Sequence, residues 1–132
     1  MTDINQIQLF VQTGSSSISS GERVFLGFNG RHGREFRCRL EGGNTNPFES
    51  DSETHLIFGQ DSNVSESNLN DPRNPQMDDL MLGRAYLRLD TTSQTEWIIR
   101  EVRININGND THNLLLNGIT LNRDSSETIY ID

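Results

Sequence analysis

Short runs in which apolar and polar residues alternate recur along the whole chain, and this pattern constrains the fold more than any other feature of the sequence. Side chains of a β-strand point alternately to its two faces, so each run predicts a strand with one buried face. Asn-Gly pairs at residues 29–30, 107–108 and 117–118 punctuate these runs, and Asn-Gly accepts the positive φ of tight hairpin turns. The pattern predicts an antiparallel sandwich or barrel, and we favour an all-β sandwich of about eight strands.

The same runs predict which residues form strands and which are buried in the core. In one run Cys38 alternates with arginines and lies between Phe36 and Leu40, which favours a small buried hydrophobe over a metal ligand or a catalytic thiol. Two segments lack the alternation, the Ser/Gly-rich residues 13–21 and the polar residues 59–79. The strands are expected near residues 7–11, 24–28, 36–40, 54–58, 85–89, 102–106, 113–116 or 119–121, and 128–131. The expected core residues are Val24, Leu26, Phe36, Leu56, Leu87, Leu89, Val102, Ile104 and Ile106.

The length of 132 residues fits one domain, so residues 1–132 are expected to form a single sandwich. No apolar run approaches the ~20 residues of a membrane-spanning helix. The first residues, MTDINQIQLFVQ, have neither the basic start nor the cleavage site of a secretory signal. The single cysteine excludes an internal disulfide framework and permits a reducing compartment. These features favour a cytoplasmic location.

The net charge of −8 is concentrated in one part of the chain. Residues 41–80 contain nine acidic residues and one arginine, and the acidic loop expected at residues 59–79 is unusually long for a compact domain. Ca²⁺ takes about six to eight oxygen ligands, which such a loop and its neighbours can supply. The alternative is a solvated acidic loop that aids solubility. The candidate Ca²⁺ ligands are Asp61, Glu66, Asp71, Asp78 and Asp79, with Glu49, Asp51 or Asp90 as further contributors.

The basic residues are arginines without exception, and Arg31, Arg34, Arg37 and Arg39 form a stripe with a single acidic residue among them. This stripe is a candidate binding site for a phospholipid head group, a sulfated sugar or an acidic partner. The alternative is that these arginines pair with acidic residues on neighbouring strands. The overall acidity argues against a nucleic-acid partner, because nucleic-acid affinity comes largely from contacts between basic residues and phosphate.

The order of these elements resembles the PLAT (lipoxygenase-homology) family, a β-sandwich related in architecture to C2 domains. The matching segments are IQLFVQTG (Ile7–Gly14), GERVFLGFNG (Gly21–Gly30), GREFRCRL (Gly33–Leu40), the turn at Leu82-Gly83, and WIIREVRI (Trp97–Ile104). The resemblance implies a PLAT/C2-like sandwich whose partner is a membrane surface, a lipid or another protein.

No catalytic motif accompanies these segments. The three histidines lie far apart in the sequence, and neither a zinc-binding spacing nor a nucleophile elbow is present. We therefore expect a non-catalytic binding module, with Ca²⁺ assistance as one variant. Trp97 is either part of the core or an exposed platform for a lipid or a sugar. The alternative functions are a carbohydrate-binding sandwich that stacks sugars on Trp97, Tyr86 or Tyr130, and a calcium-binding protein without lipid affinity.

Overall fold

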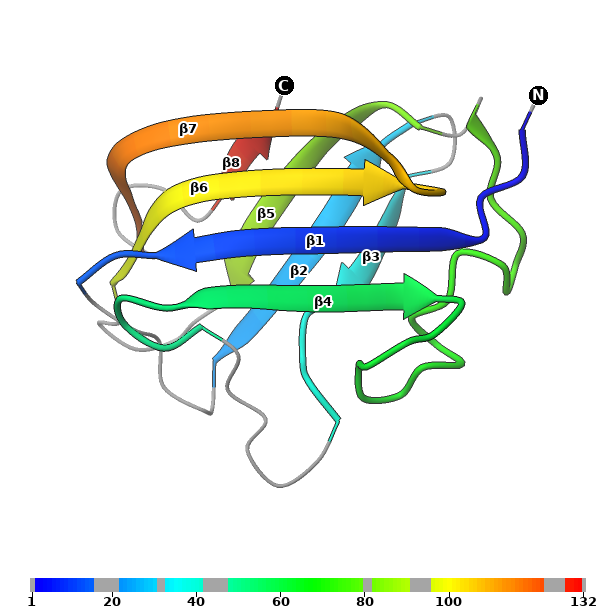
Figure 1. The fold of residues 1–132 in the computed structure, drawn as a ribbon, viewed down its shortest axis with the longest axis horizontal. Helices are drawn as coiled ribbons and strands as arrows, with labels where there is room; N and C mark the ends of the chain where they lie inside the picture. Colours follow the sequence, from blue (N-terminus) through cyan, green and yellow to red (C-terminus); the bar gives the residue numbers. More distant parts are fainter. Residues whose placement is uncertain are drawn as a thin grey trace.

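The computed structural model describes residues 2–15, 22–30, 33–41, 48–79, 82–90, 96–122 and 128–131. Two four-stranded antiparallel sheets pack face to face, which confirms the predicted all-β sandwich of about eight strands (Figure 1). The strands are β1 (Gln6–Thr13), β2 (Arg23–Asn29), β3 (Arg34–Arg37), β4 (Glu53–Gly59), β5 (Arg84–Asp90), β6 (Trp97–Ile106), β7 (Asn109–Leu121) and β8 (Thr128–Ile131).

The front sheet of Figure 1 has the strand order β4-β1-β6-β7, and the back sheet has the order β3-β2-β5-β8. Strands that pair in a sheet are often distant in the sequence. In the back sheet, for example, β2 pairs with β5 as well as with β3, so Phe25 of β2 lies between Arg37 of β3 and Arg88 of β5. Within the described residues, no helix is long and apolar enough to span a bilayer.

The core fills the space between the two sheets, and the alternation places it there. In β1, Ile7, Leu9 and Val11 are fully buried, whereas the intervening residues face outward. All nine residues predicted for the core are buried. Phe36 of the back sheet contacts Phe58 of the front sheet with their ring centroids 5.4 Å apart. Burying each such side chain stabilises the fold by about 1.5–3 kcal/mol.

Several predicted strands differ in extent from those observed; the strand expected near residues 102–106, for example, begins at Trp97. The strand expected to reach Leu40 ends at Arg37, and Leu40 instead forms an isolated bridge with Val64. The two alternatives at residues 113–116 and 119–121 both lie within the single strand β7. Cys38 is buried, as predicted, and burial raises the pKa of its thiol.

The predicted long loop, Gly59 to Asp79, is a series of turns fastened to the sandwich at the right-hand side of Figure 1. The Asn63 side chain accepts a hydrogen bond from the Ile57 N–H at 2.8 Å and donates one to the His55 carbonyl at 2.9 Å. The Asn70 side chain accepts a hydrogen bond from the Arg37 N–H at 2.7 Å. Val64 and Met77 are buried. The loop therefore contributes to the packed structure.

Candidate functional site

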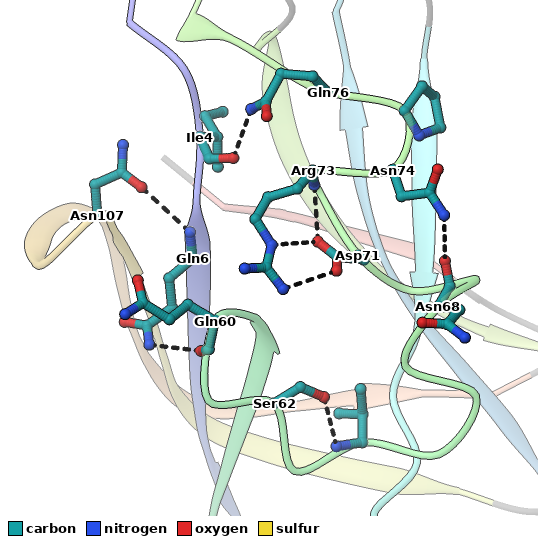
Figure 2. Close-up of polar contacts among 12 residues, drawn as sticks. Ile4, Gln6, Gln60, Ser62, Asn68, Asp71, Arg73, Asn74, Gln76 and Asn107 are labelled. Atoms are coloured by element: carbon teal, nitrogen blue, oxygen red, sulfur yellow. Dashed lines mark hydrogen bonds and ion pairs between the residues drawn. The ribbon is translucent and has the colours of Figure 1, made fainter.

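The predicted calcium ligands lie apart, and several have protein partners. Asp71 accepts two hydrogen bonds of 3.0 Å from the Arg73 guanidinium, one at each carboxylate oxygen (Figure 2). These bonds hold the pKa of Asp71 below its ordinary value. Asp79 accepts a hydrogen bond of 2.9 Å from the Thr2 N–H, which lowers its pKa as well. Asp78 forms a backbone bridge with Asp3.

The other two candidate ligands, Asp61 and Glu66, occupy turn positions with φ values of 60° and 53°. Across the described ranges, no group of three or more His, Cys, Asp or Glu side chains could hold a metal ion. The five carboxylates that the sequence singled out therefore do not converge on one centre, and calcium binding stays a prediction.

A polar hollow of about 510 Å³ lies where the loop meets the N-terminal segment. Figure 2 shows two of its amide side chains, those of Gln6 and Asn107, engaged within the protein: Gln6 donates to the Gln60 carbonyl at 2.8 Å. Asn107, at φ 52° in the predicted Asn-Gly hairpin turn, accepts hydrogen bonds from the N–H groups of Asn5 and Gln6. The hollow is lined by Thr2, Asp3, Asn5, Gln6, Gln60, Asp61, Asn107 and Gly108.

The predicted arginine stripe divides into residues with different environments. The Arg34 guanidinium donates to the carbonyls of Asp71 at 2.5 Å, Pro75 at 2.8 Å and Asn74 at 2.9 Å, so it fastens the loop to β3. Partial burial lowers its pKa. Arg37 lies on the outer face of β3, and Arg39 is exposed two residues further on. Arg31 lies outside the described residues.

Trp97 is fully buried, which confirms the core interpretation and makes the exposed-platform interpretation wrong. Its ring packs against Phe48 with centroids 4.5 Å apart, and its indole N–H donates to the Thr13 hydroxyl at 3.2 Å. Because the only polar atom of the indole is satisfied inside the protein, the ring is fully accommodated by the core.

The outer face of the back sheet gathers aromatic and arginine side chains from four strands. We call it the arginine–aromatic face. One row across the sheet runs Arg37, Phe25, Arg88, and the next runs Glu35, Gly27, Tyr86, Tyr130. Its members are Arg23, Phe25, Glu35, Arg37, Arg84, Tyr86, Arg88, Asp90 and Tyr130.

Glu35 is the centre of the hydrogen-bond network on this face. It accepts two bonds from the Arg88 guanidinium, at 2.8 and 2.9 Å, and one from the Tyr86 hydroxyl at 2.8 Å. The Arg88 bonds lower the pKa of Glu35, whereas burial and the bond to Glu35 raise the pKa of Tyr86 to about 12. The Arg88 guanidinium also lies 4.4 Å from the centre of the Phe25 ring, a cation–π contact.

The absence of a side chain at Gly27 allows this arrangement. A Cβ atom at residue 27 would lie 2.1 Å from Cζ of Tyr86, so the tyrosine ring lies across the glycine. Beyond it, the ring of Tyr130 is 5.8 Å from that of Tyr86 and has the Arg84 guanidinium 4.5 Å from its centre. The result is a broad surface of rings and guanidinium groups.

The charge of the arginine–aromatic face is opposite to that of the chain. Four arginines and two acidic residues give its described members a net charge of +2, whereas the chain carries −8. The sequence pattern indicates Arg37, Tyr86 and Tyr130 as separate candidates, but it does not indicate Phe25, Arg84 and Arg88 as site residues. The available signal was their outward position in alternating runs, which becomes a surface only when the pairing of β2 with β5 is known.

The outer face of the front sheet has a different character. Its Phe10 ring is covered on its two sides, by the stacked His55 ring at 4.2 Å and by the Arg103 guanidinium at 4.6 Å. Arg103 is paired with Glu101 at 3.2 Å, and Arg100 with Asp51 at 3.3 Å. The described arginines of this sheet therefore have carboxylate partners.

Comparisons with known proteins show the fold. No protein-family model matches the chain, and no curated protein matches it by sequence. Among solved structures, the alpha toxin of Clostridium absonum is similar with a TM-score of 0.65 and 12% identity, over 98% of this chain and 31% of the toxin. An alpha-toxin of Clostridium perfringens from an avian strain is similar with a TM-score of 0.63 and 16% identity, over 98% and 32%.

The chain thus spans about a third of the length of these toxins. At these identities the likeness concerns the fold alone. It is consistent with the PLAT/C2-like architecture that the sequence resembles, and the chain has the all-β, two-sheet sandwich that forms part of those larger proteins.

Proposed function

We propose that this chain is a non-catalytic module that binds the surface of a lipid membrane. The observation that carries the proposal is the arginine–aromatic face, a positively charged surface on an acidic protein. Arginine forms paired hydrogen bonds with phosphate, and tyrosine favours the boundary between lipid and water because its ring is apolar and its hydroxyl is polar. These two residue types together suit the head-group region of a bilayer.

The resemblance to the PLAT family supports the same proposal, because it implies a membrane, lipid or protein partner. The sandwich fold agrees with that resemblance. Among these partners we favour the membrane, since the face presents a net positive charge to a surface that is commonly negative.

Carbohydrate binding is the main alternative. Tyr130 has 40% of its surface exposed, which suits a stacking platform, but the Arg84 guanidinium already lies over its ring. A sugar would therefore stack on the opposite side of the ring. Membrane binding uses both side chains, since a tyrosine ring suits the boundary between lipid and water and an arginine binds phosphate.

Co-sedimentation with vesicles beside a glycan array tests the proposal. We expect the purified chain to sediment with vesicles of phosphatidylcholine and phosphatidylserine and to bind none of the arrayed glycans. Glycan binding without vesicle binding would overturn the proposal in favour of the carbohydrate alternative. Binding to neither would also overturn it and favour a protein partner.

Calcium is a separate prediction and is tested in the same assay by adding calcium chloride or a chelator. Equal vesicle binding in the two conditions is expected, because the described carboxylates do not converge. Binding that requires calcium would favour the calcium-assisted variant expected from the sequence.

A further inference from the structure

Resting on the proposed function, we infer that the arginine–aromatic face is itself the membrane contact, and that anionic head groups are selected by Arg37 of this face together with Arg39, which lies just after β3. This inference adds the place of contact and the class of lipid to the general proposal. The inference rests on a difference among the arginines: Arg23 and Arg88 are paired with carboxylates of the face, whereas Arg37 has no described carboxylate partner.

Two arginines of the face are engaged within the protein. Arg88 forms the paired hydrogen bonds with Glu35 and stacks over Phe25. Arg23 forms an ion pair with Asp90 at 2.7 Å. A head group would have to displace a carboxylate from either guanidinium, so these arginines hold the face together and add little attraction for a new anion.

Arg37 differs from them. It lies on the outer face of the edge strand β3, directly beside Phe25, and no carboxylate within the described part of the chain lies within ion-pair distance of it. The same holds for Arg39, which is exposed. Two arginines without described carboxylate partners thus lie two residues apart in the chain, on the edge strand β3 and just after it.

The shape of the face suits a bilayer. Gly27 has no side chain, and the ring of Tyr86 covers the place from which a side chain at residue 27 would project. Further ring surface comes from Tyr130, which is exposed on the edge strand β8 beside Tyr86. Phe25 adds a ring on β2, between Arg37 and Arg88. A broad surface of rings with cationic groups at one edge matches a plane of head groups better than it matches a single small ligand.

A charge-matched pair of variants tests the inference. R37Q/R39Q removes two positive charges from the inferred contact, and R100Q/R103Q removes two from the front sheet. We expect R37Q/R39Q to bind phosphatidylcholine–phosphatidylserine vesicles roughly twenty-five-fold more weakly than wild type, since each arginine near an anionic surface contributes about fivefold. The control should lose less than about twofold, because its arginines would face away from the bilayer.

Three further arms complete the test. Circular dichroism and thermal unfolding should show both variants folded. Vesicles of phosphatidylcholine alone should bind wild type and R37Q/R39Q equally, because they carry no net charge. Inorganic phosphate should compete no better than sodium chloride of matched ionic strength, whereas specific competition would indicate a site for free phosphate and would overturn the inference.

The outcomes separate this inference from the proposed function. Wild-type binding with equal losses in the two variants would overturn the inference and leave the membrane proposal standing. No binding of the wild type to any vesicle would overturn both.

Discussion

At the residue scale, Glu35 holds the arginine–aromatic face together because three donor groups meet at its carboxylate. The bond from Arg88 lowers the pKa of Glu35 from its ordinary value of 4.5. A carboxyl whose pKa is lowered by folding stabilises the folded state above its unfolded pKa, and this stabilisation is lost as the pH falls through the folded pKa.

Replacing Glu35 tests this network. We expect Glu35→Gln to lower the free energy of unfolding by about 1–2 kcal/mol at neutral pH, a value reduced by partial exposure of the ion pair. The difference from wild type should shrink as the pH falls from about 4.5, the ordinary value, through the lower pKa that the Glu35 carboxyl has in the folded protein. Urea unfolding at neutral and acidic pH measures both quantities.

A matched control is Glu53→Gln on the front sheet, where the exposed carboxylate lies 3.7 Å from Arg103. Such an ion pair contributes little, so the control should stay within about 0.5 kcal/mol of wild type. A loss for Glu35→Gln that is independent of pH would show that the carboxylate charge is not what stabilises the face.

Gly27 provides a second test at the same scale. Gly27→Ala places a methyl group where the Tyr86 ring lies, with Cζ only 2.1 Å from the new carbon. The ring has to move and its bond to Glu35 is strained, so we expect a loss of about 1–3 kcal/mol. In a Tyr86→Ala background the same substitution should cost much less. Equal costs in the two backgrounds, measured by chemical unfolding, would contradict the contact.

The sequence predicts the burial of a single residue when the residues near it in the chain form a clear alternating pattern, and it does not when the burial depends on distant residues. Phe36 and Leu40, two residues before and after Cys38, are apolar, and the predicted burial of Cys38 is confirmed. Trp97 begins a strand, where alternation alone does not distinguish core from surface. Its burial depends on Phe48 and Thr13, which are distant in the sequence.

At the scale of elements, the strands were predicted because alternation is a local property, and all eight appear. The anchoring of the loop was not predicted. Arg34 was interpreted as a binding residue, yet it reaches carbonyls about 40 residues further along the chain. No pattern within a single run indicates such a contact, since it depends on how the loop folds back on β3.

The loop therefore provides a prediction at its own scale. Arg34→Ala removes a guanidinium that donates to three carbonyls, so we expect a loss of about 2 kcal/mol and faster proteolysis within residues 59–79. Arg73→Ala is the matched control, because its guanidinium contacts Asp71 within the same loop. The control should cost much less, because an exposed ion pair contributes little to stability. Similar proteolysis of the two variants would show that Arg34 does not hold the loop.

At the scale of the whole molecule, the chain has a net negative charge, yet the arginine–aromatic face is positively charged. The sequence identified the acidic segment at residues 41–80, but the positive face draws its residues from β2, β3, β5 and β8. A sum along the chain does not reveal this face, because the strand order differs from the sequence order. Sheet topology is therefore the information that the sequence pattern lacked.

The acidic segment has its own prediction. If the acidic segment binds calcium as the sequence predicts, calcium chloride should raise Tm clearly more than sodium chloride of matched ionic strength, which acts through screening alone. Differential scanning calorimetry measures both. A clearly larger rise with calcium would show that the carboxylates regroup around the ion and would support the calcium site expected from the sequence.

Fluorophores on opposite faces test the membrane contact most directly. Asn29→Cys places a label on the side of the arginine–aromatic face, and Gln12→Cys places one on the exposed front sheet. The native Cys38 is buried, and burial raises the pKa of its thiol, so labelling goes to the introduced cysteine. With phosphatidylcholine–phosphatidylserine vesicles, we expect the label at residue 29 to shift to the blue and the label at residue 12 to stay unchanged. An equal response at both positions, or a response only at residue 12, would contradict membrane binding through this face.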